Sequence, residues 1–173
     1  GLYNEAEKIF SRLYDKNTNS IYTEKAIFWA GRSALKMANY QKAIEYFNKI
    51  ITLFPNSDRV AEARLWQAET LCEQGDFAGA IVLFDDAIKK ADKQWIKRIA
   101  LIRKSDCNFI LGHDDATRYE FALAGYRKIL EDNKDYNLSM ELGYKIGRTL
   151  EKMGRSSDAI EYYLQVVYLF FEY

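Results

Sequence analysis

An alanine followed four residues later by an aromatic residue recurs at a nearly fixed interval along this chain. Successive alanines are separated by 37, 37, 42 and 37 residues, and an apolar residue follows each aromatic one three positions later. Positions i, i+4 and i+7 share one face of an α-helix, so each occurrence predicts a helix with one apolar face. A fixed interval of this length is typical of repeated units that stack on one another. The five pairs are Ala6/Phe10, Ala43/Phe47, Ala80/Phe84, Ala122/Tyr126 and Ala159/Tyr163.

A second helix is predicted inside each interval. The distance from its small residue to the next alanine is 12, 12, 17 and 12 residues, so five extra residues lie in the third unit, around Gly112 to Thr117. Gly75-Asp76 and Met153-Gly154 give the turn signals between first and second helices. A small residue marks this helix 25 positions after the preceding alanine, at Gly31, Ala68, Ser105 and Gly147.

These signals predict an all-α fold of about nine helices. The single proline among 173 residues agrees with this, because proline disrupts helix interiors. Ser57, which ends the turn Phe54-Pro55-Asn56-Ser57, is expected to cap the helix that follows. The expected helices span residues 3–16, 22–37, 40–53, 58–74, 77–91, 94–111, 117–131, 136–153 and 156–171.

The spans Ala38–Phe47, continuing to Pro55, and Gln74–Phe84 resemble tetratricopeptide repeats. The shared features are the small residue of the first helix, the aromatic residue before the second helix, and the alanine and aromatic residue within it. This resemblance covers nearly the whole chain and implies a right-handed superhelix, or α-solenoid, of antiparallel helix hairpins. Two features differ: the interval is 37 residues rather than about 34, and Trp29 and Trp66 lie two positions later than the family's usual tryptophan.

The repeat pattern predicts one array over residues 1–173. The array opens on a second helix and closes on an apolar segment, so we expect the chain to be part of a longer protein. Phe54-Pro55-Asn56-Ser57, leading to Ala61-Glu62-Ala63, resembles bacterial tetratricopeptide repeat proteins of the cell envelope. That resemblance favours a periplasmic or envelope location, while the compartment itself stays open. The expected parts are an incomplete repeat at 1–19 and full repeats at 20–56, 57–93, 94–134 and 135–173.

The family resemblance implies that the first helices line a concave groove. One position after each small residue lies a charged side chain, in the order Arg32, Glu69, Asp106 and Arg148. Under one interpretation, Arg32 pairs with Glu69 and Asp106 with Arg148, and the apolar residues one turn earlier are inter-helix core. Under the other, the face is a ligand groove with an acidic middle and apolar walls, suited to a peptide with basic residues. The candidate partner-binding residues are Phe28, Arg32, Leu65, Glu69, Glu73, Asp106, Tyr144 and Arg148.

Other functional classes have little support in the sequence. Lys and Arg number 25, and so do Asp and Glu, so no basic footprint for nucleic acid is visible. No stretch approaches 18 apolar residues, so no membrane insertion is expected. The acidic middle of the groove also argues against binding a chain-terminal carboxylate, as one subgroup of the family does.

The sequence contains no motif for catalysis, phosphate binding or a cofactor, and we expect no enzyme activity, cofactor or metal. Cys72 and Cys107 are expected to be thiols, because a disulfide cannot be established from their positions. The insertion from Gly112 to Thr117 contains the one histidine, His113, beside two aspartates. It is best interpreted as a turn in which Asp115 or Thr117 caps the next helix; contact with a partner and metal ligation are the alternatives.

The sequence thus predicts a non-catalytic scaffold that binds a protein or peptide segment in its concave groove. The alternative is a structural spacer, or a module that assembles end to end through an apolar end face. The residues expected at that face are Leu169, Phe170 and Phe171.

Overall fold

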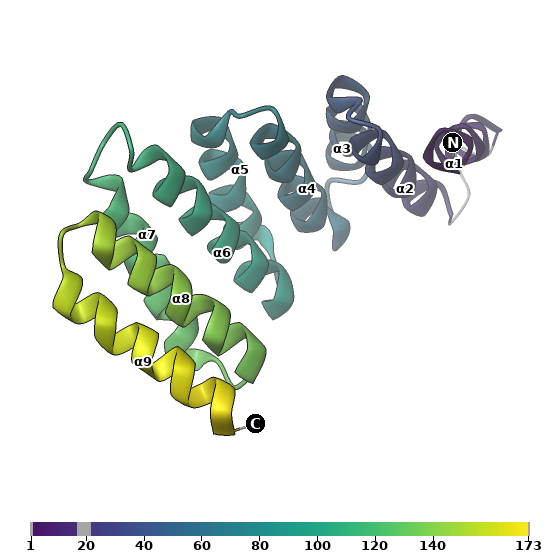
Figure 1. Cartoon of the computed structure of the whole chain (residues 1–173). Coiled ribbons are helices and arrows are strands. Elements are labelled where there is room, and N and C mark those ends of the chain that lie inside the picture. Colours follow the sequence, from purple (N-terminus) through teal and green to yellow (C-terminus); the bar gives the residue numbers. More distant parts are fainter. Residues whose placement is uncertain (1, 17–21, 173) are drawn as a thin grey trace. The chain divides into compact units, whose positions relative to one another are not determined.

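The computed structural model describes residues 2–16 and 22–172, and these residues form nine α-helices and no β-strand (Figure 1). Every helix begins and ends within one residue of the range expected from the sequence. The all-α prediction is therefore confirmed for the described part of the chain. The helices are α1 (Leu2–Lys16), α2 (Thr23–Lys36), α3 (Tyr40–Leu53), α4 (Arg59–Glu73), α5 (Phe77–Lys90), α6 (Gln94–Leu111), α7 (Arg118–Asp132), α8 (Tyr136–Lys152) and α9 (Ser156–Glu172).

The helices divide into two compact units, and each is described by itself. Unit 1 comprises Gly1–Ala100 and contains α1 to α5 with the start of α6. Unit 2 comprises Leu101–Tyr173 and contains the rest of α6 with α7, α8 and α9. The division of the chain into one continuous array of repeats stays a prediction.

Within a hairpin, the small residue of the first helix makes room for the aromatic ring of the second. In unit 1, a Cβ atom placed on Gly31 of α2 would lie 2.9 Å from the Phe47 ring of α3. In unit 2, a Cβ atom on Gly147 of α8 would collide with the Tyr163 ring of α9. In these two hairpins, the small residue of the first helix and the repeated aromatic residue of the second helix therefore form one contact.

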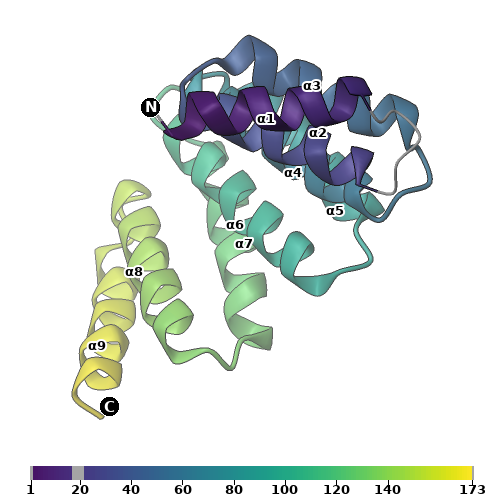
Figure 2. The ribbon, with the colours of Figure 1, turned by 90° about the vertical axis from the view of Figure 1, so that its right-hand side faces the viewer.

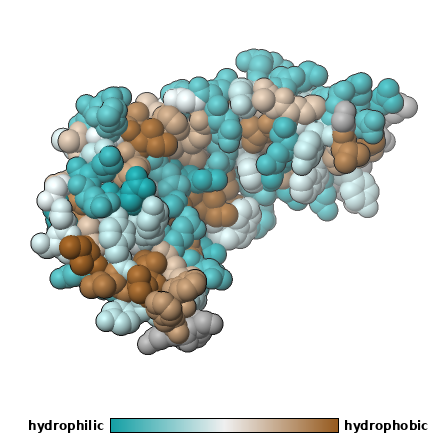
Figure 3. Space-filling model, viewed as in Figure 1, coloured by the Kyte–Doolittle hydropathy of each residue, from teal (hydrophilic) through white to brown (hydrophobic). Residues whose placement is uncertain are grey.

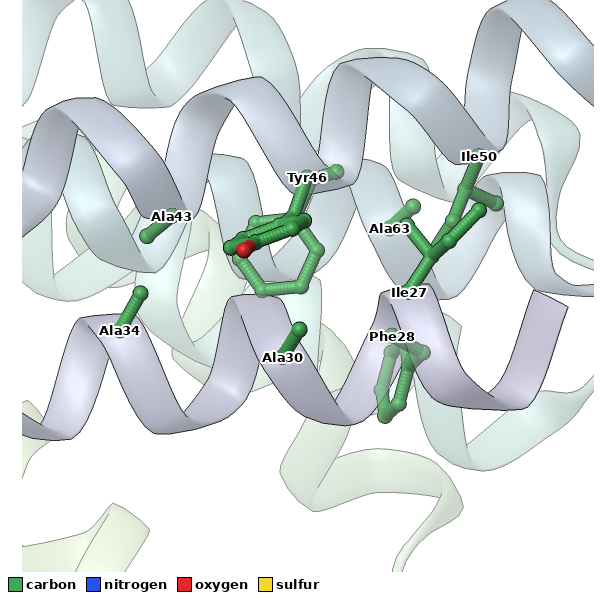
Figure 4. Close-up of a cluster of buried hydrophobic side chains, with 9 residues drawn as sticks. Ile27, Phe28, Ala30, Ala34, Ala43, Tyr46, Ile50 and Ala63 are labelled. Atoms are coloured by element: carbon green, nitrogen blue, oxygen red, sulfur yellow. The ribbon is translucent and has the colours of Figure 1, made fainter. Parts of the chain in front are cut away.

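The core of unit 1 shows how closely these helices approach. Figure 4 shows Ala34 of α2 facing Ala43 of α3, with larger side chains filling the space further along the two helices. Side chains of this size allow the backbones to approach while the bulkier residues bury apolar surface, the main favourable term in folding. The fully buried cluster also includes Ile27, Phe47, Ile50 and Ala63.

Short polar side chains begin several of the helices. Asn39, Asp76 and Asp135 each accept a hydrogen bond from a backbone N–H group in the first turn of the helix that follows. Ser57 accepts one from the backbone N–H of Arg59, 3.0 Å away, and donates its hydroxyl to Glu24 of α2. These bonds satisfy donors that a helix start leaves unpaired. Ser57 lies one residue before the N-cap position of α4, which Asp58 occupies without a side-chain capping bond, so the prediction of a Ser57 cap holds only for its bond to Arg59.

Three hairpin turns repeat one backbone conformation. The turns after α2, α4 and α8 each place one residue in the left-handed region, with φ of 55° at Ala38, 81° at Gly75 and 73° at Gly154. In each case the next residue donates its N–H to a carbonyl five residues earlier, at 2.9 Å. This closing pattern reverses the chain within three residues and makes the helices antiparallel neighbours, as α8 and α9 are in Figures 1 and 2.

Because alanine is strained in the left-handed region and glycine is not, we expect Ala38→Gly to raise the free energy of unfolding by about 0.5–1 kcal/mol. Gly75→Ala is the matched reverse change, and it should lower stability by about 1 kcal/mol. A Cβ atom at Gly75 would meet no other atom within 4 Å, so the effect there is conformational. Urea unfolding followed by circular dichroism measures both. A loss of stability in Ala38→Gly would contradict this account of the turn.

Candidate partner-binding site

A pocket of about 260 Å³ opens in unit 2 between α6 and α8. We call it the α6–α8 pocket. Three of the eight residues predicted to contact a partner line it, namely Asp106, Tyr144 and Arg148. Its volume is below the roughly 300–1,000 Å³ of typical small-molecule sites, so it fits one side chain better than a metabolite. Its remaining lining residues are Phe109, Ile110, Tyr126 and Lys145.

Asp106 is the acidic residue of the pocket, and its carboxylate is held by three donors. The Tyr126 hydroxyl donates to Oδ1 at 2.6 Å, and the Lys145 ammonium donates to the same oxygen at 2.7 Å. Arg103 Nη1 lies 3.7 Å from Oδ2. Burial, followed by the charge of Asp106, raises the pKa of Tyr126 above its ordinary value, so Tyr126 stays a neutral donor. The negative charge of Asp106 is therefore largely compensated within the chain.

Arg148 lies at the rim of the pocket beside Tyr144. Its Nη1 donates to the Tyr144 hydroxyl at 3.1 Å, and this bond is the main cause that raises the pKa of Arg148. Its Nε lies 4.0 Å from Oε2 of Glu151, which also accepts the Tyr163 hydroxyl at 2.6 Å. Burial and then the bond to Glu151 raise the pKa of Tyr163 to about 12. The rim of the pocket thus carries the positive charge of Arg148, whose side chain is oriented by Tyr144.

The pairing predicted between Asp106 and Arg148 is corrected by these contacts. Asp106 pairs with Lys145, three residues before Arg148, while Arg148 binds Tyr144 and approaches Glu151. Lys145 and Tyr126 are the pocket residues that the sequence reasoning missed. The sequence analysis compared one charged position on each first helix, which on α8 is Arg148, and therefore did not consider Lys145. The hydroxyl of Tyr126 gives no separate signal in the sequence, because its ring is explained by packing.

In unit 1, two of the predicted groove residues are buried. Phe28 is 2% exposed and Leu65 is 1% exposed. Phe28 packs edge-on against Phe47 of α3, with ring centroids 6.1 Å apart. Both residues therefore have the inter-helix core role that their spacing allowed, and neither gives a partner accessible surface.

The charged residues of unit 1 are engaged to different degrees. The Arg32 guanidinium stacks on the Trp66 ring, 3.4 Å from its centroid. Burial lowers the pKa of Arg32, while the charges of Glu62 and Glu69 act in the opposite direction. The pairing of Arg32 with Glu69 stays a prediction. Glu73 lies at the end of α4 and is exposed.

The insertion after α6 is a turn. Asp115 Oδ1 accepts hydrogen bonds from the backbone N–H of Thr117 at 3.1 Å and from its hydroxyl at 2.6 Å. These bonds lower the pKa of Asp115. Arg118, the first residue of α7, lies 3.7 Å from the same carboxylate. Thr117 occupies the N-cap position of α7 without a side-chain capping bond, and Asp115 holds Thr117 in the turn before the helix.

The two cysteines and the possible metal-binding side chains are the remaining groups of chemical interest. Cys72 and Cys107 are thiols, and Cys107 is buried. Within residues 2–16 and 22–172, no three His, Cys, Asp or Glu side chains gather closely enough to hold a metal ion. No helix in the described part of the chain has the length and apolarity required to cross a lipid bilayer.

Comparison with known families identifies two matching stretches. Residues 28–94 match the tetratricopeptide repeat family, and so do residues 144–173. Together they make up more than half of the chain. Among curated protein sequences, none matches the chain at a significant level.

Solved structures show the same fold at low sequence identity. A crystal structure of MamA aligns over 98% of this chain and 90% of its own, with a TM-score of 0.77 and 16% identity. MamA from Desulfovibrio magneticus RS-1 aligns over 96% of this chain and 94% of its own, with a TM-score of 0.68 and 14% identity. TTC0263, a TPR protein from Thermus thermophilus, aligns over 96% and 82%, with a TM-score of 0.62 and 16% identity. At such identities the likeness establishes the fold alone.

The hydrogen bond from Tyr126 to Asp106 should contribute measurably to stability. Tyr126→Phe keeps the ring but leaves Asp106 without one donor, so we expect the free energy of unfolding to fall by about 1.5 kcal/mol. Tyr144→Phe removes a hydroxyl from an exposed residue of the same pocket and should change stability by less than about 0.5 kcal/mol. Urea unfolding of the two variants makes the comparison. Equal effects would contradict the role given to Asp106.

Proposed function

The chain belongs to the tetratricopeptide repeat family, and from this premise we propose that it binds a segment of another protein along its first helices. Proteins of this family serve as protein-interaction scaffolds, and their fold is generally non-catalytic. We propose the α6–α8 pocket as the anchor point. The supporting observation is that this pocket lies between two first helices and contains accessible apolar side chains, because Tyr144 is 50% exposed and Ile110 is 46% exposed.

The pocket suits an apolar side chain from the partner. Ile110 and Tyr144 are partly exposed, and Phe109 and Tyr126 lie deeper in the lining. Transferring an apolar side chain from water onto such a surface contributes about 25 cal/mol per Å² of apolar area buried. A few anchors of this kind commonly dominate the affinity of a protein interface.

The sequence predicts a preference for basic residues in a partner. The carboxylates of unit 1 support this preference better than those of unit 2. In unit 1, the exposed carboxylate of Glu73 on α4 is available to a Lys or Arg side chain. In unit 2, Asp106 is already compensated by Lys145 and therefore offers little attraction to a further cation. We restrict the proposed basic preference to unit 1. The cell-envelope location stays a prediction.

Selection of binding peptides from a random phage-displayed library tests groove binding. We expect selected peptides to bind the intact chain and to lose at least about tenfold in affinity with Ile110→Asn combined with Tyr144→Ser, since two apolar contacts are removed. Phe121→Ser is the matched control, because Phe121 is an exposed aromatic residue of unit 2 on α7, outside the pocket. Circular dichroism confirms equal helicity. Peptides that bind the double variant as well as the intact chain would overturn the proposal.

Self-association through an end face is the second candidate, and the outer face of α9 favours it. Apolar side chains at helical spacing are about half exposed or more along this helix, and Figure 3 shows hydrophobic surface over α9. Exposed apolar patches of this kind mark interaction surfaces. Unit 1 carries exposed apolar residues on α1, including Leu2 and Ile9, so a second copy offers apolar surface of its own. The α9 residues are Ile160, Leu164, Val167, Tyr168 and Phe171.

Sedimentation velocity over a range of protein concentrations distinguishes this candidate. If the α9 face associates with a second copy, Leu164→Lys combined with Val167→Lys should leave a monomer at concentrations where the intact chain forms dimers. Gln165→Lys places a charge on the same helix at an exposed polar position and should leave association unchanged. An intact chain that is monomeric throughout the concentration range would remove self-association and leave groove binding unaffected.

A further inference from the structure

We infer that the α6–α8 pocket selects a partner segment in which an Asp or Glu side chain lies next to the apolar anchor. The inference rests on the proposed function of this pocket and names the chemistry of its ligand. It differs from the basic partner that the sequence predicts, because the charge of the pocket is set by contacts that the sequence did not reveal.

The first step concerns what Asp106 leaves available. Its two oxygens face the Tyr126 hydroxyl, the Lys145 ammonium and the Arg103 guanidinium. Lys145 also pairs with Glu141, and the distance from Lys145 Nζ to Glu141 Oε1 is 3.1 Å. These groups compensate one another, so Asp106 and Lys145 leave little remaining attraction for an ion of either sign.

The second step concerns Arg148, whose charge is weakly compensated. Its side chain is 45% exposed, and its nearest carboxylate, on Glu151, is 4.0 Å away and shared with the Tyr163 hydroxyl. A guanidinium has five N–H donors, and the Tyr144 hydroxyl engages Nη1 alone. That bond also holds the side chain in place beside the apolar lining, so less side-chain entropy is lost when a carboxylate binds.

The third step excludes the opposite charge. A Lys or Arg side chain in the pocket would come close to Arg148 and Lys145, with Asp106 already occupied. Like charges brought together at an interface act against the wrong partner. A carboxylate at the same place could form two parallel hydrogen bonds with the guanidinium of Arg148. Because Arg148 lies at the exposed rim, where a bound chain would pass over the surface, we assign this carboxylate to a side chain of the partner.

Short acetylated and amidated peptides provide the probe. Each contains one leucine in a Gly/Ser background, with Glu, Gln or Lys at a neighbouring position that is varied in turn. We expect the best Glu peptide to bind at least about tenfold more tightly than its Gln counterpart, and the Lys peptide to bind most weakly. Perturbation of amide NMR signals during titration of the whole chain gives the affinities and places the peptide on the pocket residues.

Two substitutions show whether Arg148 causes the preference. Arg148→Gln should bring the Glu and Gln peptides to equal affinity, whereas Lys152→Gln removes the same charge from an exposed residue outside the pocket and should preserve the difference. The carboxylate could also come from the C-terminus of a partner. To test this source, the Gln peptide is compared in two forms, one with an amidated C-terminus and one with a free C-terminal carboxylate. Tighter binding of the free carboxylate than of the Glu side chain would overturn our assignment.

The outcomes also separate this inference from the proposed function. If Gln or Lys peptides bind best and Ile110→Asn weakens them, the pocket is an anchor site and the acidic preference is wrong. If no peptide perturbs the pocket residues and Ile110→Asn changes nothing, both are wrong. Support for the inference requires the Glu peptide to bind best and the preference to disappear with Arg148→Gln.

Discussion

The contact between a small residue on one helix and an aromatic ring on the next is the constraint on which the hairpins depend. Gly31 admits the ring of Phe47 in unit 1, and Gly147 admits the ring of Tyr163 in unit 2. A larger side chain at either glycine would push the two helices apart, because packed interiors leave no spare volume. The rotation of each first helix, and hence the set of residues on its outer face, follows from this contact.

The sequence predicted the helices almost completely, because periodic apolar positions, polar caps and turn residues are local signals. It predicted the site less well. Phe28 and Tyr144 occupy equivalent positions, yet Phe28 is buried and Tyr144 is half exposed. Likewise, Lys145 rather than Arg148 reaches Asp106. Such differences depend on which side chains of other helices reach each position, as Phe47 and Arg59 reach Phe28, and repeat spacing alone does not resolve them.

Arg32 and Arg148 show how one repeat position serves two purposes. The guanidinium of Arg32 is covered by Trp66 of α4, so burial lowers its pKa. The guanidinium of Arg148 is held by Tyr144 on its own helix, and that hydrogen bond raises its pKa. The aromatic neighbour therefore decides whether the arginine is covered by the next first helix, as Arg32 is, or stays at the surface, as Arg148 does. Trp66 lies two positions later than the family's usual tryptophan, and from this position its ring contacts the Arg32 guanidinium.

The aromatic residue of the repeat also links the core to charged side chains of the first helices. In the first three occurrences it is Phe, at Phe10, Phe47 and Phe84, whereas in unit 2 it is Tyr126 and Tyr163. Each tyrosine keeps the packing role and donates its hydroxyl to a carboxylate on a first helix, Tyr126 to Asp106 and Tyr163 to Glu151. Both carboxylates are thereby drawn away from other partners. A hydroxyl added to a packing position thus orients a charged side chain on a first helix, so that a repeat scaffold can vary its surface without altering its backbone.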